Sequence, residues 1–346
     1  MKFLKASLII FALPAALAIC GCSKNPEETK TAAPSNAPII AVQAQAPETN
    51  TVTNEKPTEP KPIAEAATNA ATAAALEPPK TEQVHPEQPK FEEARTLFFS
   101  SDKKLREKAL QLFHEAAEAG NSAAQHALAI IYLTGSGAPK NQENGLVWLQ
   151  KSAAQGHADA QFRLASLYMR GDLVPKDIDK AVEFVRKAAE QKHPEAEYNL
   201  GTLYATGTGV PTDLKEAVNW FRKAAESGHA TAQSNLGVLY ASGDGVEKNM
   251  VEAVKWWRRA AEQGQRTAQF NLAQILTEGK EVTKDLVEAY KWYSLAADQG
   301  DRDALRLRNT LALELSPEEV AEGLKRSREF NSQLRTRQRE ERERQF

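Results

Sequence analysis

The sequence repeats one 36-residue unit five times in succession, without insertions. The units span residues 122–157, 158–193, 194–229, 230–265 and 266–301. A fixed period of this length marks a repeat architecture, in which each unit buries its apolar face only by stacking on its neighbours. Proteins built this way mostly bind other molecules along an extended surface. We number the positions within each unit from 1 to 36.

Each unit is predicted to contain two helices. Apolar residues at positions 3, 7 and 11 share one helical face, as do Ala196, Leu200 and Tyr204. Position 14 is glycine in all five units, which predicts the end of the first helix. Position 20 is always Asn or Asp, an N-cap type for the second helix. In three units Glu follows three residues later, as in Asp213 and Glu216, which is the spacing of a capping box.

The second helix combines small residues at positions 24, 31 and 32 with large apolar residues at positions 27 and 28. The small residues allow close approach of paired helices, and the large ones fill the space between units. Glycine at position 35 ends this helix, with Lys192 as the exception. The predicted fold is all-α: a right-handed α-solenoid of stacked antiparallel helix pairs.

Both ends of the array resemble the polar-faced caps that solenoids require. Residues 91–121 follow the repeat pattern loosely and are predicted to form a degenerate N-terminal capping repeat. Residues 302–330 are predicted to form a C-terminal helical cap, in which Ser316 serves as an N-cap. The tail at 331–346 is rich in Arg and Glu and predicts a solvated helix, with contact to anionic lipid as an alternative.

Composition restricts the chemistry of the folded part. The only two cysteines are Cys20 and Cys22, so the repeats lack a disulfide, a thiolate metal site and a thiol nucleophile. The net charge of −2 gives no field that would attract nucleic acid. We therefore expect no nucleic-acid partner and no cofactor.

The N-terminus is predicted to be a signal peptide. Lys2 and Lys5 precede an apolar run over 6–19, which is shorter than a typical membrane-spanning helix. The run ends in a sequence like a bacterial lipobox, with Gly21 directly before Cys22. We therefore expect residues 1–21 to be removed and Cys22 to be lipidated. The acyl chains would then supply the anchor, because several buried alkyl chains give stable membrane residence. Lipidation of Cys20 and ordinary cleavage after residue 18 are the alternatives.

Residues 22–90 are predicted to form a disordered linker. They are rich in Ala, Pro and Thr, and residues 23–90 contain no Phe, Tyr or Trp. Such a segment cannot bury enough apolar surface to offset its ordering entropy. The linker would act as a spacer between an anchor and the repeats.

The repeats resemble the Sel-1-like repeat family, which is related to tetratricopeptide repeats. The marks are Ala-x-x-x-Leu-Gly-x-x-Tyr, Gly-x-Gly-Val, Asp-x-x-x-Ala-x-x-Trp and Lys-Ala-Ala-x-x-Gly, all present in residues 194–229. Leu173 and Glu281 depart from the pattern at the second loop glycine, so we expect altered inter-helix loops there. The resemblance implies a scaffold or adaptor that binds proteins. One branch of the family has been linked to β-lactam binding or hydrolysis, but it carries paired repeat cysteines that are absent here.

By analogy with tetratricopeptide proteins, positions 2, 5, 6 and 9 of the first helices should face a peptide-binding groove, and positions 5 and 6 supply the candidate contacts. An Asn side chain can bind a peptide backbone through its donor and its acceptor, and neighbouring aromatic rings supply apolar contact. The alternative is that these asparagines belong to the family's ordinary repeat pattern. The predicted partner-binding residues are Phe162, Arg163, Tyr198, Asn199, Ser234, Asn235, Phe270 and Asn271.

Other candidate sites are better explained structurally. His157, His193 and His229 recur at position 36. Equivalent residues of stacked units lie on the order of 10 Å apart, too far to share one metal ion. Ser-x-x-Lys occurs at Ser100 and Ser101 without the motifs that accompany it in β-lactamases. No metal site and no catalytic residue are predicted.

The sequence therefore predicts a non-catalytic scaffold or adaptor in the bacterial cell envelope, lipid-anchored at the outer membrane on its periplasmic side. Its partner would be a protein or peptide. The alternatives are a β-lactam- or peptidoglycan-acting hydrolase and a secreted factor that binds host proteins.

Overall fold

The computed structural model describes residues 88–345, in which all regular secondary structure is helical. The signal peptide, Cys22 and residues 22–87 of the linker lie outside the described residues. The first helix begins at Gln88, three residues before the predicted boundary at 91. No described helix combines the length and apolar character needed to cross a membrane.

The five units form ten helices of 13 residues each. The first helices are α3 (Ser122–Thr134), α5 (Ala158–Arg170), α7 (Pro194–Thr206), α9 (Ala230–Ser242) and α11 (Arg266–Glu278). The second helices are α4 (Gln142–Ala154), α6 (Ile178–Glu190), α8 (Leu214–Glu226), α10 (Met250–Glu262) and α12 (Leu286–Asp298). The flanking helices are α1 (Gln88–Phe98), α2 (Lys103–Glu118), α13 (Arg302–Leu311) and α14 (Pro317–Gln345).

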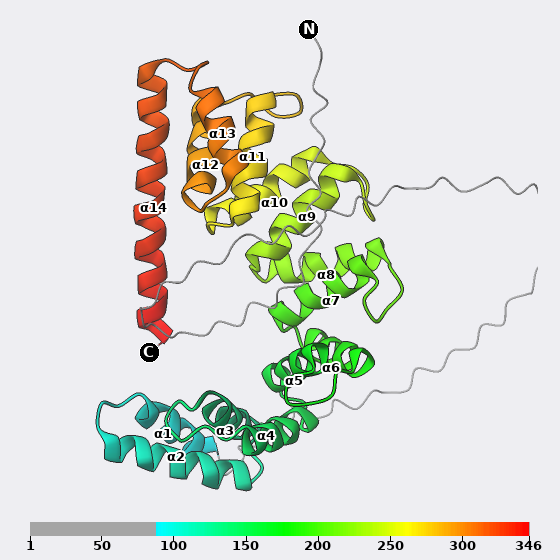
Figure 1. The fold of residues 1–346 in the computed structure, drawn as a ribbon, viewed down its shortest axis with the longest axis vertical. Coiled ribbons are helices and arrows are strands. Elements are labelled where there is room, and N and C mark those ends of the chain that lie inside the picture. Colours follow the sequence, from blue (N-terminus) through cyan, green and yellow to red (C-terminus); the bar gives the residue numbers. More distant parts are fainter. Residues whose placement is uncertain (1–87, 346) are drawn as a thin grey trace, which may run out of the picture. The chain divides into compact units, whose positions relative to one another are not determined.

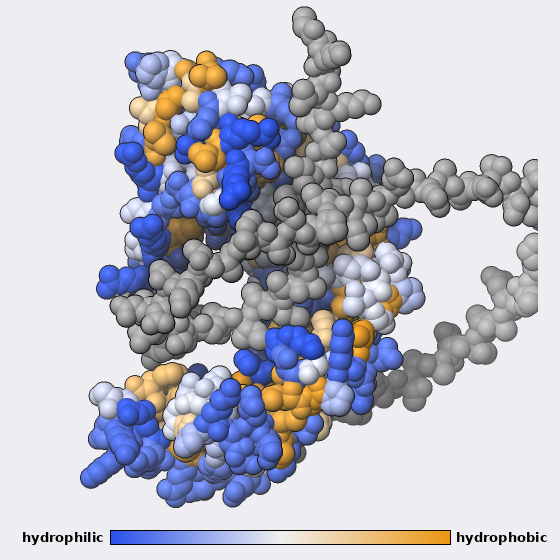
Figure 2. All heavy atoms as spheres, in the orientation of Figure 1, coloured by the Kyte–Doolittle hydropathy of each residue, from blue (hydrophilic) through white to orange (hydrophobic). Residues whose placement is uncertain are grey.

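The helices stack in chain order (Figure 1). The two helices of each unit pack together, and each second helix also packs against the first helix of the next unit. The predicted α-solenoid of stacked helix pairs is confirmed. Buried side chains form clusters along the array, because each unit places the same apolar positions against its neighbour. The surface in Figure 2 is mostly hydrophilic, interrupted by hydrophobic patches.

The predicted helix ends are also confirmed. The glycines at position 14 are left-handed, with φ of 70° at Gly207, and their N–H groups bond to the helix they end. The side chain of Asp213 accepts a hydrogen bond from the Glu216 N–H at 3.1 Å. The Asp213 N–H bonds to the Tyr204 carbonyl at 3.0 Å instead of the Glu216 carboxylate, so only half of the capping box forms. This bond ties the second helix to the first.

Position 8 shows how closely the paired helices approach. A Cβ atom on Gly237 would lie 2.5 Å from the Trp257 ring, and one on Gly201 would lie 2.8 Å from the Phe221 ring. Position 8 is glycine in the two units with Phe or Trp at position 28, and alanine in the units with Leu, Val or Tyr there. At Gly201 and Gly237 the missing Cβ thus makes room for the rings of Phe221 and Trp257.

The two loop departures behave differently. Leu173 retains the left-handed backbone of the glycines at this position, with φ of 62°. The expectation of an altered loop was therefore wrong for this unit. Glu281 does not adopt positive φ, so its loop does change. Lys192 replaces the position-35 glycine and keeps φ at 65°, a conformation that costs an L-residue about 1–2 kcal/mol.

The second helix of the C-terminal cap continues through the tail as one helix, α14. Ser316 is the N-cap, as predicted, and it forms a reciprocal capping box with Glu319 through bonds of 2.8 and 3.2 Å. The first part of α14 packs on α12, where the rings of Phe330 and Trp292 meet edge to face with centroids 5.3 Å apart. Gly323 permits this approach, since a Cβ there would lie 2.9 Å from Tyr290.

Candidate functional site

The predicted groove residues lie on consecutive first helices, α5, α7, α9 and α11. Their exposure differs. Ser234 is only 1% exposed, which removes it from the candidate surface. Phe162, Tyr198 and Phe270 are half-buried and pack against the core clusters. The row is therefore part core and part surface.

The three asparagines at position 6 are also half-buried. Asn199 donates its side-chain N–H to the Glu195 carbonyl of its own helix at 2.8 Å. The side-chain nitrogen of Asn235 is buried and has no hydrogen-bond partner. Burial raises the pKa of the neighbouring Tyr198, while the polar groups of Thr202 and Asn235 oppose that shift. Asn235 thus differs from the freely solvated side chain that a simple groove residue would have.

Residues at position 5 pack against the position-36 residue that begins the next first helix. The His126 and His157 rings stack with centroids 4.8 Å apart, and those of Tyr198 and His229 at 4.5 Å. The Phe162 and His193 rings are tilted at 4.9 Å. These ring pairs link consecutive first helices along the side that carries the predicted groove residues.

Position 36 serves as the N-cap of the following first helix. His193 Nδ1 accepts the Ala196 N–H at 3.2 Å, and His229 Nδ1 accepts the Ala232 N–H at 3.1 Å. Gln265 does the same in the next unit. The structural role expected for these histidines is confirmed for His193 and His229. His157 departs from it, because its side chain makes no capping bond.

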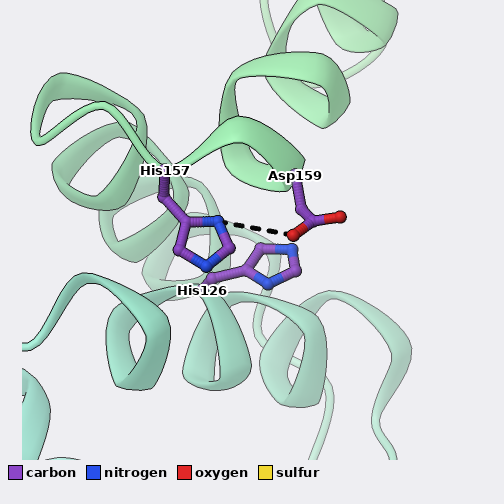
Figure 3. Close-up of side chains that lie close together, drawn as sticks. All are labelled: His126, His157 and Asp159. Atoms are coloured by element: carbon purple, nitrogen blue, oxygen red, sulfur yellow. Dashed lines mark ion pairs between the residues drawn. The ribbon is translucent and has the colours of Figure 1, made fainter. Parts of the chain in front are cut away.

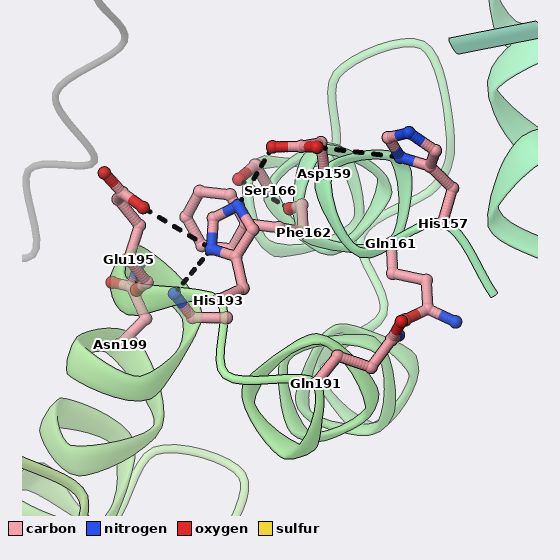
Figure 4. A network of polar contacts seen from close by, with 10 residues as sticks. His157, Asp159, Gln161, Phe162, Ser166, Gln191, His193, Glu195 and Asn199 are labelled. Atoms are coloured by element: carbon pink, nitrogen blue, oxygen red, sulfur yellow. Dashed lines mark hydrogen bonds and ion pairs between the residues drawn. The ribbon is translucent and has the colours of Figure 1, made fainter. Parts of the chain in front are cut away.

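His157 instead belongs to a polar cluster, which Figure 4 shows from the turn before α5 to the start of α7. Its Nδ1 lies 3.7 Å from Asp159 Oδ2, and Asp159 Oδ1 lies 3.2 Å from His193 Nε2. Because His193 Nδ1 accepts a backbone N–H, its proton resides on Nε2, which donates to Asp159. We call His126, His157, Asp159 and His193 the histidine–aspartate cluster.

The environment sets the charges in this cluster. Burial and the nearby His157 lower the pKa of His126 to about 4, and burial also lowers the pKa of His157. The hydrogen bond from His193 lowers the pKa of Asp159 to about 2. At neutral pH, His126 and His157 are therefore neutral and Asp159 is ionised.

A second feature missed by sequence reasoning is a glutamine ladder at positions 4 and 34. In four units the position-34 Gln donates to the position-4 Gln at 2.7–2.8 Å, as Gln263 does to Gln233. The position-4 Gln then donates to a carbonyl of the preceding second helix, as Gln233 does to Ala225 at 3.0 Å. The ladder was detectable in the sequence, because Gln recurs at both positions.

The ladder is interrupted in the third unit. Glu197 replaces the position-4 Gln and Ser227 replaces the position-34 Gln. Glu197 is 3% exposed, and its Oε2 has no hydrogen-bond partner. Burial raises the pKa of Glu197, although the charges of Lys223 and His193 partly oppose the shift.

Comparison with known proteins places the chain in the Sel1 repeat family. The Sel1 repeat model matches residues 101–121, 122–157, 158–193, 194–229, 230–265 and 267–301. The first match shows that the capping segment before the array is itself a partial repeat. The chain therefore belongs to the Sel1 repeat family. A search of curated proteins finds no match.

Two solved structures resemble the chain at 33% sequence identity. One is a protective antigen present in uropathogenic Escherichia coli strains that displays an SLR fold, with a TM-score of 0.62. The match covers 71% of this chain and 53% of that protein, so it spans about half of its length. The other is a Sel1 repeat protein from Oxalobacter formigenes, with a TM-score of 0.57, matched over 68% of this chain and 96% of that one.

Proposed function

We propose that the chain is a non-catalytic scaffold of the bacterial cell envelope that binds a protein or peptide through the surface of its repeats. Its anchor would be a lipid on Cys22, and the linker would separate that anchor from the array. The observation that carries this proposal is the row of half-buried aromatic and amide side chains on successive first helices. Such a row suits an extended partner that contacts several repeats at once.

The binding surface would draw on the partly exposed members of the row. Tyr198 and Phe270 would contribute half-buried aromatic rings, and Asn199 and Asn271 would contribute amide groups. Arg163, also half-buried, adds a positive charge, although burial lowers its pKa. Ser234 is excluded from this surface by its burial.

Chemical crosslinking in cells, followed by mass spectrometry of the captured proteins, tests this proposal. The informative variant is Asn271→Ala, and the matched control is Asn219→Ala, which removes an exposed amide from the second helix α8. We expect Asn271→Ala to reduce capture of a specific protein by about fivefold or more, because one lost hydrogen bond is worth about 1 kcal/mol. Equal capture by both variants and the wild type would contradict binding through the first-helix row.

A further inference from the structure

Three side chains of the histidine–aspartate cluster converge on one point between the first two units. His126 comes from α3, His157 from the turn before α5, and Asp159 from the first turn of α5 (Figure 3). One ligand atom from each lies within 4.8 Å of the other two. Two imidazole nitrogens and one carboxylate oxygen form a typical donor set for Zn²⁺ and related transition-metal ions.

One ring nitrogen of each of the two histidines lacks a hydrogen-bond partner. His126 Nε2 and His157 Nδ1 are both buried from solvent and make no hydrogen bond, although His157 Nδ1 lies 3.7 Å from Asp159 Oδ2. In His193 and His229 the corresponding Nδ1 caps the next helix, whereas in His157 it faces Asp159. A buried nitrogen without a partner is uncommon in folded proteins, and a bound ion would satisfy it.

The charges of the cluster suit a cation. Both histidines are neutral at neutral pH and Asp159 is ionised, which are the forms that coordinate metals. Arg163 lies near enough to oppose a positive charge on His126, and it would likewise weaken metal binding. His193 offsets this in part by orienting Asp159 through its Nε2, as outer-shell partners of metal ligands do.

We propose that His126, His157 and Asp159 bind one divalent transition-metal ion of the Zn²⁺ class. Coordination bonds of about 2.0–2.2 Å require the three ligand atoms to move closer together. The two stacked rings, whose planes differ by 26°, must also turn about their Cβ–Cγ bonds, since the in-plane lone pairs of rings stacked in this way do not meet at one ion. The three side chains leave a fourth position of a tetrahedral ion for water or for a side chain of a binding partner.

Residues that occupy the same positions in other units are suitable substitutions, because the repeat fold already accommodates them. Position 5 is Phe in two units, position 36 is Gln in one, and position 2 is Thr in two. The test variants are therefore His126→Phe, His157→Gln and Asp159→Thr. The matched control is His229→Gln, which changes a position-36 histidine that stacks on Tyr198 instead of a second histidine.

Titration calorimetry with Zn²⁺ tests the proposal on the untagged full chain, with Cys20→Ser and Cys22→Ser to remove competing thiolates. We expect one ion per chain. Each of the three variants should weaken affinity at least about tenfold, because loss of an outer-shell partner alone typically costs 10–100-fold. His193→Gln should weaken binding about tenfold, and His229→Gln should leave it unchanged.

The absorption spectrum of bound Co²⁺ provides a second measurement, and circular dichroism checks that each variant is folded. Zn²⁺ affinity equal in the wild type and in a His126→Phe, His157→Gln double variant would overturn the proposal. An equal loss of affinity in His229→Gln would also overturn it, since binding would then not depend on this cluster. Because no protein partner takes part, the outcome is independent of the proposed scaffold function.

Discussion

Replacing Glu197 with Gln should stabilise the protein. In the other four units the equivalent Gln donates a hydrogen bond to the preceding second helix at 3.0–3.3 Å. An ionised Glu197 has no proton to donate, and its buried Oε2 has no partner. Such an unsatisfied buried group costs about 1–3 kcal/mol. We therefore expect Glu197→Gln to raise the free energy of unfolding by about 1–2 kcal/mol at neutral pH. Adding Ser227→Gln should contribute about 0.5–1.5 kcal/mol more by completing the ladder.

The effect should depend on pH with a defined sign. The folded-state pKa of Glu197 is raised by burial, so protonation of this carboxyl favours the fold. The stability linked to Glu197 is fully present below its ordinary pKa and is lost as pH rises through its folded-state value. The advantage of Glu197→Gln over the wild type should therefore be larger at pH 7 than at pH 4.5.

Denaturant unfolding of both proteins at the two pH values measures this difference. Glu190→Gln, at an exposed site of α6, is the control and should change stability by less than about 0.5 kcal/mol. A Glu197→Gln variant that is less stable than the wild type would refute the reasoning. A gain of the same size at both pH values would show that proton linkage at Glu197 is not its cause.

Four further predictions concern backbone strain, packing and the anchor. Lys192→Gly should stabilise the array by about 0.5–1 kcal/mol in thermal denaturation, because the relief of left-handed strain exceeds the added chain entropy. Gly237→Ala should destabilise it by about 1–3 kcal/mol, since its Cβ would overlap the Trp257 ring, and an unchanged denaturant midpoint would contradict that packing. Trp220→Ala should cost about 3–5 kcal/mol by the same measurement, because the side chain is buried and Lys223 lies 3.6 Å above its ring. Mass spectrometry of the mature N-terminus should find acylated Cys22, and a chain that begins at residue 19 or 20 would contradict this assignment.

The repeat pattern alone was enough to predict most of the fold. Glycine at position 14 and Asn or Asp at position 20 have one conformational or capping role wherever they occur, so their periodicity predicted the ends of the helices. The register of the units followed from the same residues, and the Sel1 repeat model matches the five units with nearly the same boundaries. The helix ends and the register depend on the conformational and capping preferences of single residues, and these preferences can be read from the sequence.

Contacts between successive first helices were harder to predict. His126 and His157 meet because position 5 packs against position 36, a pairing of residues 31 apart that no local rule indicates. Reasoning that compared only equivalent positions, such as His157 and His193, therefore missed the cluster. The burial of Ser234 was missed for a related reason, because helical periodicity alone does not show how far the adjacent helices cover one side of a first helix.

Site-specific photocrosslinking in living cells tests the central claim of a protein-binding first-helix row most directly. A photoreactive amino acid would replace Asn271 on α11 in one strain and Val251 in another. Val251 lies on the second helix α10 and is 67% exposed. The scaffold account predicts that the probe at 271 captures one protein reproducibly while the probe at 251 does not. Reproducible capture of a protein by the probe at 251 alone, or capture of no protein at either position, would contradict the scaffold account.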